Sequence, residues 1–235
     1  MIPWIFWTLL GLMPCPSDMV AVPRHPGVCI DRYEWPNKKG EVPWTTLSGT
    51  PEVRDVKLGR VMDAEAICAS VNKRVCWSDE WQDACVGKNR SKYPFGNKLP
   101  SPNTYLKFPE TQPCNYAWLQ PRYDGMKIYL RDVTELEKLG RASASGERGC
   151  VSASGAEDMM GNVYEWVRAP ITSSTKWGIA GGDWFHPASC HEVVGGHSPK
   201  WFWNTTGVRC CSDLVVVDPA HRTSPQSART MRHSR

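Results

Sequence analysis

The sequence predicts an α+β fold that is rich in loops and held together by disulfides. The chain has 235 residues, the length of one large domain or of two small ones that share a core. Ten cysteines favour an oxidising compartment, while 19 glycines, 19 prolines and 12 tryptophans are typical of short elements joined by irregular loops. Short segments with helix or strand patterns alternate along the chain, and no internal repeat is present.

The charge distribution excludes two classes of protein. The formal net charge is +4, and residues 218–235 hold four arginines against one aspartate, so the rest of the chain is close to neutral. A nucleic-acid groove needs clustered positive charge, which such a body does not supply. No apolar run approaches the ~18 residues of a membrane-spanning helix, so an integral membrane protein is excluded as well.

The N-terminal segment bears on location. Residues 1–14 begin with an apolar run, MIPWIFWTLLGL, that resembles the core of a secretion signal but lacks the usual basic residues before it. The alternative is an apolar strand of the core. We expect a secreted or periplasmic protein, mainly because of the cysteines; a lipoprotein anchor at Cys15 is a further alternative that the preceding residues support poorly.

Local patterns predict the elements in order. Residues 18–35 alternate apolar and polar around a Pro-Gly turn, which indicates a hairpin. Residues 63–72 form a helix by pattern, with Asp63 as the N-cap. Residues 78–86 predict a second helix, because Asp79 and Glu80 suit the positive first turn.

The second half of the domain is predicted to be mostly loop and strand. Residues 88–155 are rich in glycine, proline, serine and asparagine, with one short helix at 133–139. Short aromatic segments separated by glycines predict strands from Trp177 onward. We therefore expect one domain over residues 15–217 and a disordered basic tail over 218–235.

Five sequence segments carry a family resemblance. In chain order they are KRVCWSDEWQDACVG (73–87), YPFGN (93–97), DMMGNVYEW (158–166), GGDWF (181–185) and TGVRCC (206–211). As an ordered set across residues 18–213, they resemble the formylglycine-generating enzyme family, also called the sulfatase-modifying factor domain. The resemblance implies a variant of the C-type-lectin fold, with a small twisted antiparallel sheet, few short helices and much irregular loop.

The departures from that family bear on function. The oxidases of that family share a redox cysteine pair shortly after the Gly-Gly of the fourth segment. This pair holds the copper that oxidises a substrate cysteine. Here residues 183–189 contain no cysteine, and Cys190 is the only catalytic candidate. The resemblance instead implies that Cys190 is structural and bonds Cys85, and that Cys68 bonds Cys210. Copper, which as Cu(I) favours thiolates, is therefore not expected.

Six cysteines remain after these two implied bonds. These six would form three further disulfides, which gives five in all, and we expect the pairs Cys15–Cys29, Cys114–Cys150 and Cys76–Cys211. The sequence alone leaves this connectivity open.

A calcium site is expected in the third segment. The resemblance implies that Asp158, Gly161, Val163 and Glu165 bind a structural Ca²⁺, two through carboxylates and two through backbone carbonyls, which is a ligand mixture that calcium accepts. The alternative is that Asp158 and Glu165 only cap and solvate a tight glycine turn. Asn115 matches part of a second family calcium site, whose later ligands cannot be located.

A binding surface is expected near the fourth segment. Three adjacent aromatics at 201–203 cannot all face inward on a strand, so at least one should be exposed or cover a groove. We expect a surface formed by Trp184, His186, Trp201 and Trp203, with a loop folding back over them as the alternative. A zinc or copper site at His186, Cys190 and His191 is a further alternative that we favour less than a simple turn at Pro187.

Two function classes follow. The first is a noncatalytic, extracytoplasmic, calcium-stabilised family member that binds a protein or peptide. The second is an oxidoreductase that acts on a protein cysteine through a site without the usual cysteine pair. Two free thiols among Cys190, Cys210 and Cys211 would favour the enzyme, and five complete bridges would favour the binding module. The sequence leaves the oligomeric state open.

Overall fold

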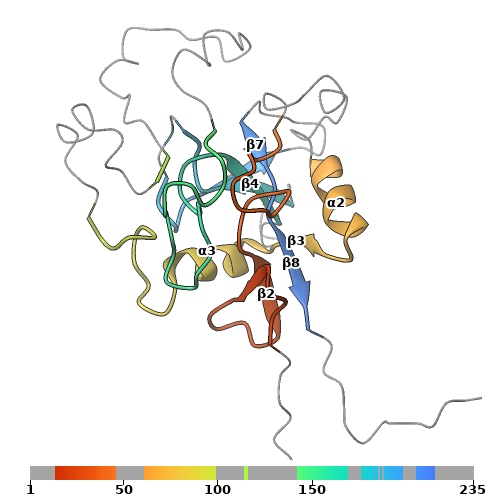
Figure 1. The fold of residues 1–235 in the computed structure, drawn as a ribbon, viewed down its shortest axis with the longest axis horizontal. Coiled ribbons are helices and arrows are strands. Elements are labelled where there is room, and N and C mark those ends of the chain that lie inside the picture. The colour runs from red at the N-terminus through yellow and green to blue at the C-terminus, as the bar shows by residue number, and fades with distance from the viewer. Residues whose placement is uncertain are drawn as a thin grey trace, which may run out of the picture.

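Two small sheets and two helices form the part of the chain that the structure describes (Figure 1). In this computed structural model these are residues 14–45, 61–98, 114–115, 142–168, 176–184, 186, 188–197 and 205–214. The predicted helix at 133–139 and the predicted tail at 218–235 lie outside these ranges, as does the predicted N-terminal segment 1–14 except for residue 14. The α+β class with few short helices and much loop is confirmed.

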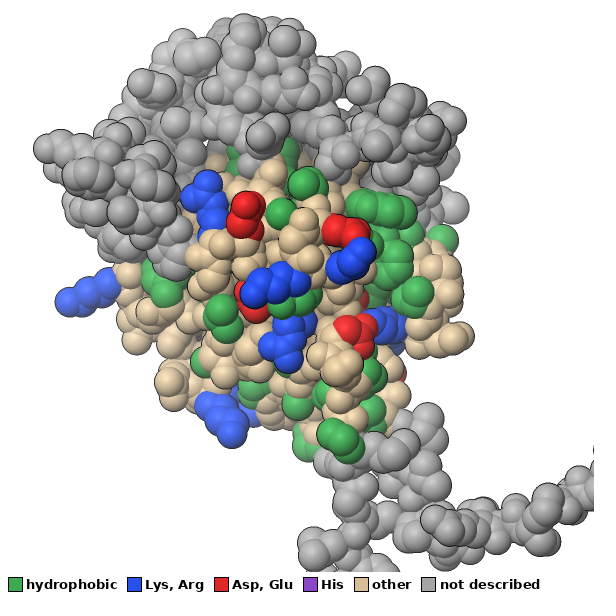
Figure 2. All heavy atoms as spheres, in the orientation of Figure 1, with side chains coloured by type: hydrophobic (Ala, Val, Ile, Leu, Met, Phe, Trp, Pro, Cys, Tyr) green, Lys and Arg blue, Asp and Glu red, His purple; other side chains and the backbone are tan. Residues whose placement is uncertain are grey.

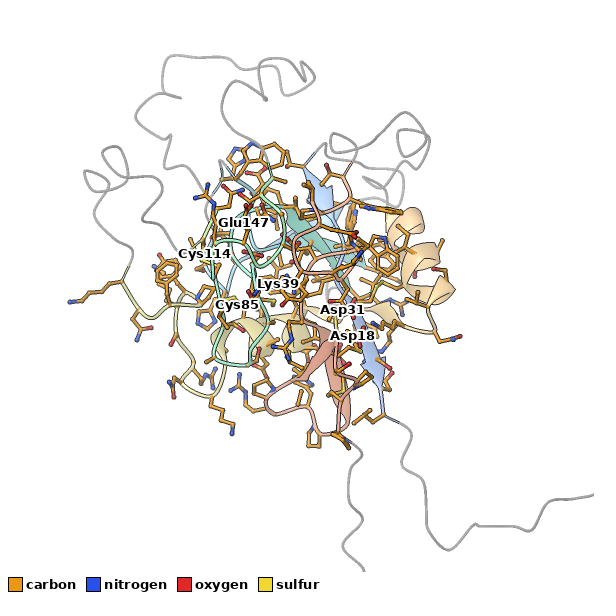
Figure 3. The ribbon with its side chains drawn as sticks, in the orientation of Figure 1. Asp18, Asp31, Lys39, Cys85, Cys114 and Glu147 are labelled. Carbon is orange, nitrogen blue, oxygen red and sulfur yellow. A yellow bond between two sulfur atoms is a disulfide. The ribbon has the colours of Figure 1, made fainter. Side chains whose placement is uncertain are left out.

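The first sheet joins the two ends of the domain. Its order is β1 (Met19–Ala21), β2 (Val28–Asp31), β8 (Cys210–Asp213) and β3 (Arg74–Val75), and all its pairs are antiparallel. The predicted hairpin at 18–35 is confirmed as β1 and β2, which pair with Met19 opposite Asp31. Asp18 and Asp31 lie near one another in Figure 3, and both accept hydrogen bonds from Lys73.

The second sheet carries the candidate site. Its order is β6 (Val193–His197), β5 (Trp177–Ala180), β4 (Tyr164–Arg168) and β7 (Thr206–Gly207). The β4–β7 pair is parallel, whereas the other two pairs are antiparallel. The fold thus has two sheets where the family resemblance led us to expect one, because the strands after Trp177 divide between them.

The helices flank the first sheet. Helix α3 (Ser78–Val86) has the predicted bounds, and the Glu80 carboxylate accepts a hydrogen bond from the backbone N–H of Trp77, the N-cap, at 2.8 Å. Helix α2 (Val61–Ser70) begins two residues before Asp63. The prediction that Asp63 is the N-cap is therefore wrong, because Asp63 lies within the first turn of the helix.

Large aromatic side chains and disulfides fill the core. Trp81 of α3 and Trp166 of β4 are both fully buried and belong to separate apolar clusters. Trp81 packs with residues of β2 and of the Asp158–Glu165 segment, and Trp166 packs with α2, β3 and β5. Burial of a side chain of this size stabilises a domain by about 3 kcal/mol, so both tryptophans are main contributors to the core.

All ten cysteines are paired in five disulfides. The pairs are Cys15–Cys29, Cys68–Cys210, Cys76–Cys211, Cys85–Cys190 and Cys114–Cys150, which are the pairs expected from the sequence. Consecutive side chains on a strand point to opposite faces. Adjacent Cys210 and Cys211 on β8 therefore attach this strand to α2 on one side and to the segment before α3 on the other.

The visible surface carries mixed charge. Figure 2 shows lysine or arginine side chains interspersed with acidic ones on the face in view, and no large field of one sign. Among the described residues, no helix has the length and apolar character needed to cross a bilayer.

Candidate functional site

The segment from Asp158 to Glu165 curls tightly before it enters β4. Asp158, Gly161 and Asn162 have positive φ angles of 57°, 76° and 58°. Glycine adopts this conformation without strain, and aspartate and asparagine tolerate it better than other residues. The GN pair in this segment thus permits a bend that turns its backbone toward the interior of the domain.

Glu165 is held at the centre of the domain by Arg209. The Arg209 guanidinium is fully buried and donates to both carboxylate oxygens of Glu165 at 2.9–3.1 Å. The indole Nε1 of Trp81 donates to Glu165 Oε2 at 2.6 Å. Arg209 also donates to the carbonyl oxygens of Asp31, Arg32 and Glu157. A single side chain therefore ties together β2, β4 and the loop before Asp158.

Glu34 holds the same segment from the N-terminal half of the chain. Its carboxylate is fully buried and accepts hydrogen bonds from Ser145 Oγ at 2.9 Å and Asn162 Nδ2 at 2.7 Å. The backbone N–H of Val163 also donates to Glu34, at 3.3 Å. The Asn162 side-chain oxygen in turn accepts from Asn115 Nδ2, so Asn115 belongs to this network.

The buried carboxylates of Glu34, Asp158 and Glu165 influence one another. Burial, followed by the negative charges of Asp158 and Glu165, raises the pKa of Glu34 well above its ordinary value. Burial also raises the pKa of Asp158 to about 6, although the backbone N–H of Gly146 donates to it at 2.6 Å. Arg209 offsets one of the three negative charges. When all three carboxylates are ionised, two negative charges remain.

The four positions expected to bind calcium fit that ion in donor type and in charge. Asp158 and Glu165 would contribute carboxylates and Gly161 and Val163 carbonyls, and a divalent cation would balance the two remaining charges. Glu165 already shares its oxygens with Arg209 and Trp81, so ligation would require it to give up part of those hydrogen bonds. Within the described ranges no three Asp, Glu, His or Cys side chains converge on a metal position.

The loop after β5 is joined to this curled segment by backbone hydrogen bonds. Gly161 N–H donates to the carbonyl of Gly181 at 2.8 Å, and Trp184 N–H donates to the carbonyl of Asn162 at 3.1 Å. Trp184 was expected on the binding surface, but only 4% of it is exposed. That part of the prediction is wrong, because the indole packs inward and can support a surface without contacting a partner.

His186 is the exposed member of a polar group in this loop. Asp183 is fully buried; its carboxylate accepts from Thr205 Oγ1 at 2.6 Å and from the backbone N–H of His186 at 2.7 Å. The imidazole Nδ1 of His186 lies 3.2 Å from Asp183 Oδ1, and 39% of the His186 side chain is exposed. The Tyr164 ring lies 6.3 Å from the imidazole. Burial raises the pKa of Tyr164, so this phenol stays protonated.

Cys190 is not available for catalysis or metal binding. It is fully buried and bonded to Cys85 of α3. The candidate catalytic role of Cys190 is therefore contradicted, as is the alternative of a metal site that uses its thiolate with His186 and His191. A disulfide sulfur is neither a nucleophilic thiolate nor a strong metal ligand.

The sequence did not point to all of the residues that the structure brings together. Trp201 and Trp203, expected on the binding surface, lie outside the described residues. Glu34, Asp183, Thr205 and Arg209 were not assigned a site role. Arg209 stands in the TGVRCC segment and Asp183 in the GGDWF segment, so the position of each within a segment that carries the family resemblance offered a signal. Glu34 and Thr205 offered none, because their partners are distant in sequence.

Comparison with known families identifies the architecture. The family model of the sulfatase-modifying factor enzyme 1-like domain matches residues 32–214, which is most of the chain and includes the second sheet together with β3 and β8 of the first. The chain belongs to this family. No curated protein matches it.

Two solved structures of low sequence identity, with TM-scores just above 0.5, share the fold of this family member. PvdO from Pseudomonas aeruginosa is 15% identical with a TM-score of 0.52, and the match covers 86% of this chain and 93% of PvdO. The Major Tropism Determinant M1 variant is 10% identical with a TM-score of 0.51, over 86% of this chain and 54% of that one. Treponema denticola variable protein 1 is 19% identical with a TM-score of 0.39, over 60% and 48%. The chain thus spans about half the length of the latter two proteins.

Proposed function

We propose that this chain is a noncatalytic, extracytoplasmic member of the sulfatase-modifying factor family that binds a protein or peptide partner. The pairing of all ten cysteines carries the proposal. Copper-dependent oxidation of a substrate cysteine needs two protein thiolates, and a chain whose cysteines are all bonded has none to offer. Five disulfides also favour an oxidising compartment outside the cytoplasm.

A partner would bind over the loop that contains His186. Of this loop, His186 is held in place by the buried Asp183 carboxylate, and Trp184 by its hydrogen bond to Asn162. A surface that is already rigid loses little conformational entropy on binding, which favours recognition. Exposed His186 and the aromatic residues Trp201 and Trp203 would supply the contacts, and extended polypeptide is the ligand class that we propose.

Calcium at the Asp158–Glu165 segment is the stabilising cofactor that we propose. The raised pKa values of Glu34 and Asp158 support it, because ionisation of these buried carboxylates is costly by itself and a divalent cation would stabilise their ionised forms. When bound, calcium would serve as a structural ion beneath the His186 loop, since Gly161 and Asn162 bond directly to that loop.

A thiol count tests the noncatalytic assignment. The natively folded chain is denatured without reductant and treated with an alkylating reagent, and its intact mass is measured. We expect no label, with full labelling of all ten cysteines after reduction as the control. Two labels on Cys190 and Cys210 or Cys211 would instead favour the alternative, an oxidoreductase that acts on a protein cysteine. Copper binding and oxygen-dependent cysteine oxidation would then be assayed.

Selection from a displayed library of random peptides tests partner binding. We expect enriched peptides to bind the wild-type chain and to bind His186→Ala at least about tenfold more weakly, because a central contact is commonly worth more than 1 kcal/mol. Asp79→Ala, at an exposed position in the first turn of α3, is the control and should bind like the wild type. Equal binding by His186→Ala would contradict the proposed position of the surface.

A further inference from the structure

We propose that an extended polypeptide binds as an added strand along the outer edge of β6, through hydrogen bonds to the backbone of Val193 and Gly195. This inference rests on the proposed binding function and names how the peptide is held. β6 directly follows the loop that contains His186, so the edge and the loop belong to one continuous part of the chain. The observation that carries the inference is an exposed strand edge, which among the described residues has no strand beside it.

β6 differs from the other strands at the sheet edges. Within the described ranges, the two sheets end in β1, β3, β6 and β7. β3 and β7 are only two residues long, and β1 exposes Ala21 alone. β6 has five residues, of which Val194, Gly195 and Gly196 are all exposed, and it has no lysine, acidic residue or proline to protect its edge. Such an edge presents N–H and C=O groups that form a template for another extended chain.

The hydrogen bonds of β4 determine the direction of the backbone groups in β5. The Tyr164 N–H donates to the carbonyl of Thr205 at 3.0 Å, on the side of β4 that is away from β5. Backbone groups alternate in direction along a strand, so those of Glu165 face β5. Glu165 lies opposite Ala180, and the backbone groups of Ala180 therefore face β4.

The same alternation shows which groups of β6 face outward. Ile179, the neighbour of Ala180, faces β6 and lies opposite Val194, so the backbone groups of Val194 face β5. The N–H and C=O groups of Val193 and Gly195 consequently point away from the sheet, which gives two donors and two acceptors. Within the described part of the chain, these outward groups form no hydrogen bond.

The space around this edge is open. A Cβ added at Gly195 or Gly196 would meet no atom within 4 Å, so another backbone can approach closely. The side chain of Val194 is 43% exposed, and a cross-strand neighbour on an added strand would cover part of it. Since apolar side chains pair well across strands, we expect the peptide residue opposite Val194 to be β-branched or aromatic.

The size of the edge favours a peptide over a second copy of the chain. A stable dimer buries about 1,200 Å² or more of total surface, and three exposed residues on one strand supply only a small part of that area. The bulge in the β5–β6 pairing, where Gly196 has a φ of 94°, also ends the regular edge after Gly195. An extended peptide needs only this short stretch of backbone and can make its other contacts on the preceding loop.

An N-methyl scan of a bound peptide tests strand addition. The probe is the tightest binder that the displayed library yields on the wild-type chain. Each backbone N–H of this peptide is replaced in turn by an N-methyl group, and the dissociation constant for the folded, full-length chain is measured. We expect a period of two: methyl groups that face β6 should weaken binding at least about tenfold, and the alternate ones less than about threefold. Effects without this period would overturn strand addition but leave the proposed binding function intact, whereas a library that yields no binder would overturn both.

Proline variants test the same edge from the side of the protein. Gly195→Pro removes the outward N–H without removing a hydrogen bond to β5, and edge strands tolerate proline at such positions. It should weaken the peptide at least about tenfold. Ala21→Pro is the matched control: the Val22 N–H donates to the carbonyl of Val28, so the groups of Ala21 face away from β2, and this variant should bind like the wild type. Melting temperatures show whether both variants fold, and wild-type affinity in a folded Gly195→Pro would overturn the proposal.

Sedimentation of the chain without peptide tests the competing occupant. We expect the wild-type chain to sediment as a monomer at the concentrations used for binding. A dimer that Gly195→Pro dissociates and Ala21→Pro retains would assign the edge of β6 to a second copy, and the peptide proposal would then be wrong.

Discussion

At the scale of single residues, Arg209 determines the charge balance of the interior. Its guanidinium is fully buried and donates hydrogen bonds to both carboxylate oxygens of Glu165. Its remaining N–H groups donate to three backbone carbonyls. Burial by itself lowers the pKa of Arg209, but Glu165, Glu34 and Asp158 together outweigh burial and raise this pKa, so the side chain stays charged. A buried charge of this kind is tolerated only because every donor is paired.

Removal of Arg209 should therefore be severe. Arg209→Met would leave the Glu165 carboxylate buried without its partner, and we expect the free energy of unfolding to fall by about 3–5 kcal/mol. Arg24→Met is the matched control, because Arg24 forms its ion pair with Asp83 at the surface, where such pairs contribute about 1 kcal/mol or less. Urea denaturation of both variants measures the difference. Similar losses for the two would contradict the central role of Arg209.

His197 should make stability depend on pH. Its imidazole lies edge-on to the buried Trp166 ring at 6.0 Å, and burial lowers the pKa of His197 below the usual 6.5. The unfolded chain then binds a proton more readily than the folded chain. Stability should fall as the pH drops from about 6.5 through the folded-state pKa and should not fall further, for this group, below it. The melting temperature of His197→Gln, plotted against pH, should lack the part of the slope that His197 causes. An unaltered slope would mean that other titrating groups cause it.

At the scale of elements, the tight turn after β5 depends on Gly182. A Cβ at this position would lie 2.1 Å from the His186 carbonyl oxygen and 2.9 Å from the Ala188 nitrogen, both of which are backbone atoms. The turn cannot relax without moving the His186 loop. It also follows Gly181, which itself has a positive φ of 90° and bonds to Gly161.

Gly182→Ala should destabilise the domain by about 2 kcal/mol, from the positive φ and the backbone clash together. Gly195→Ala is the control: it lies in β6, where an added Cβ would meet no atom within 4 Å. Its effect should stay within about 0.5 kcal/mol. Thermal unfolding compares the two, and equal stability of Gly182→Ala and wild type would show that the turn rearranges freely.

The elements show where sequence patterns suffice. The bounds of α3 could be predicted because Asp79 and Glu80 mark its first turn, and the hairpin because its alternation flanks a turn. The division into two sheets could not, since β7 is two residues long and pairs in parallel with β4, some 40 residues earlier. In the site, Asp158 and Glu165 share a recognisable motif. Glu34 contacts Asn162 across 128 residues, and no local pattern reports such a contact.

At the scale of the whole molecule, calcium would couple the curled segment to the stability of the domain. Chelation should lower the melting temperature, because three buried carboxylates would then face only one guanidinium. Asp158→Ala should abolish this effect of the chelator, whereas Asp79→Ala on α3 should retain it. A melting curve that the chelator leaves unchanged in the wild-type protein would rule out the proposed ion.

The arrangement of the disulfides has a consequence for proteolysis. Three bonds, Cys68–Cys210, Cys76–Cys211 and Cys85–Cys190, connect the part of the chain before residue 86 to the part after residue 189. A protease that cuts once anywhere between these limits would release no fragment, because the three disulfides still join the two pieces to each other. A cut at any point in this stretch of more than 100 residues would therefore leave the two ends of the domain joined. A single cut in this stretch would therefore become visible only after reduction, when the intact mass or the gel mobility would show two pieces in place of one.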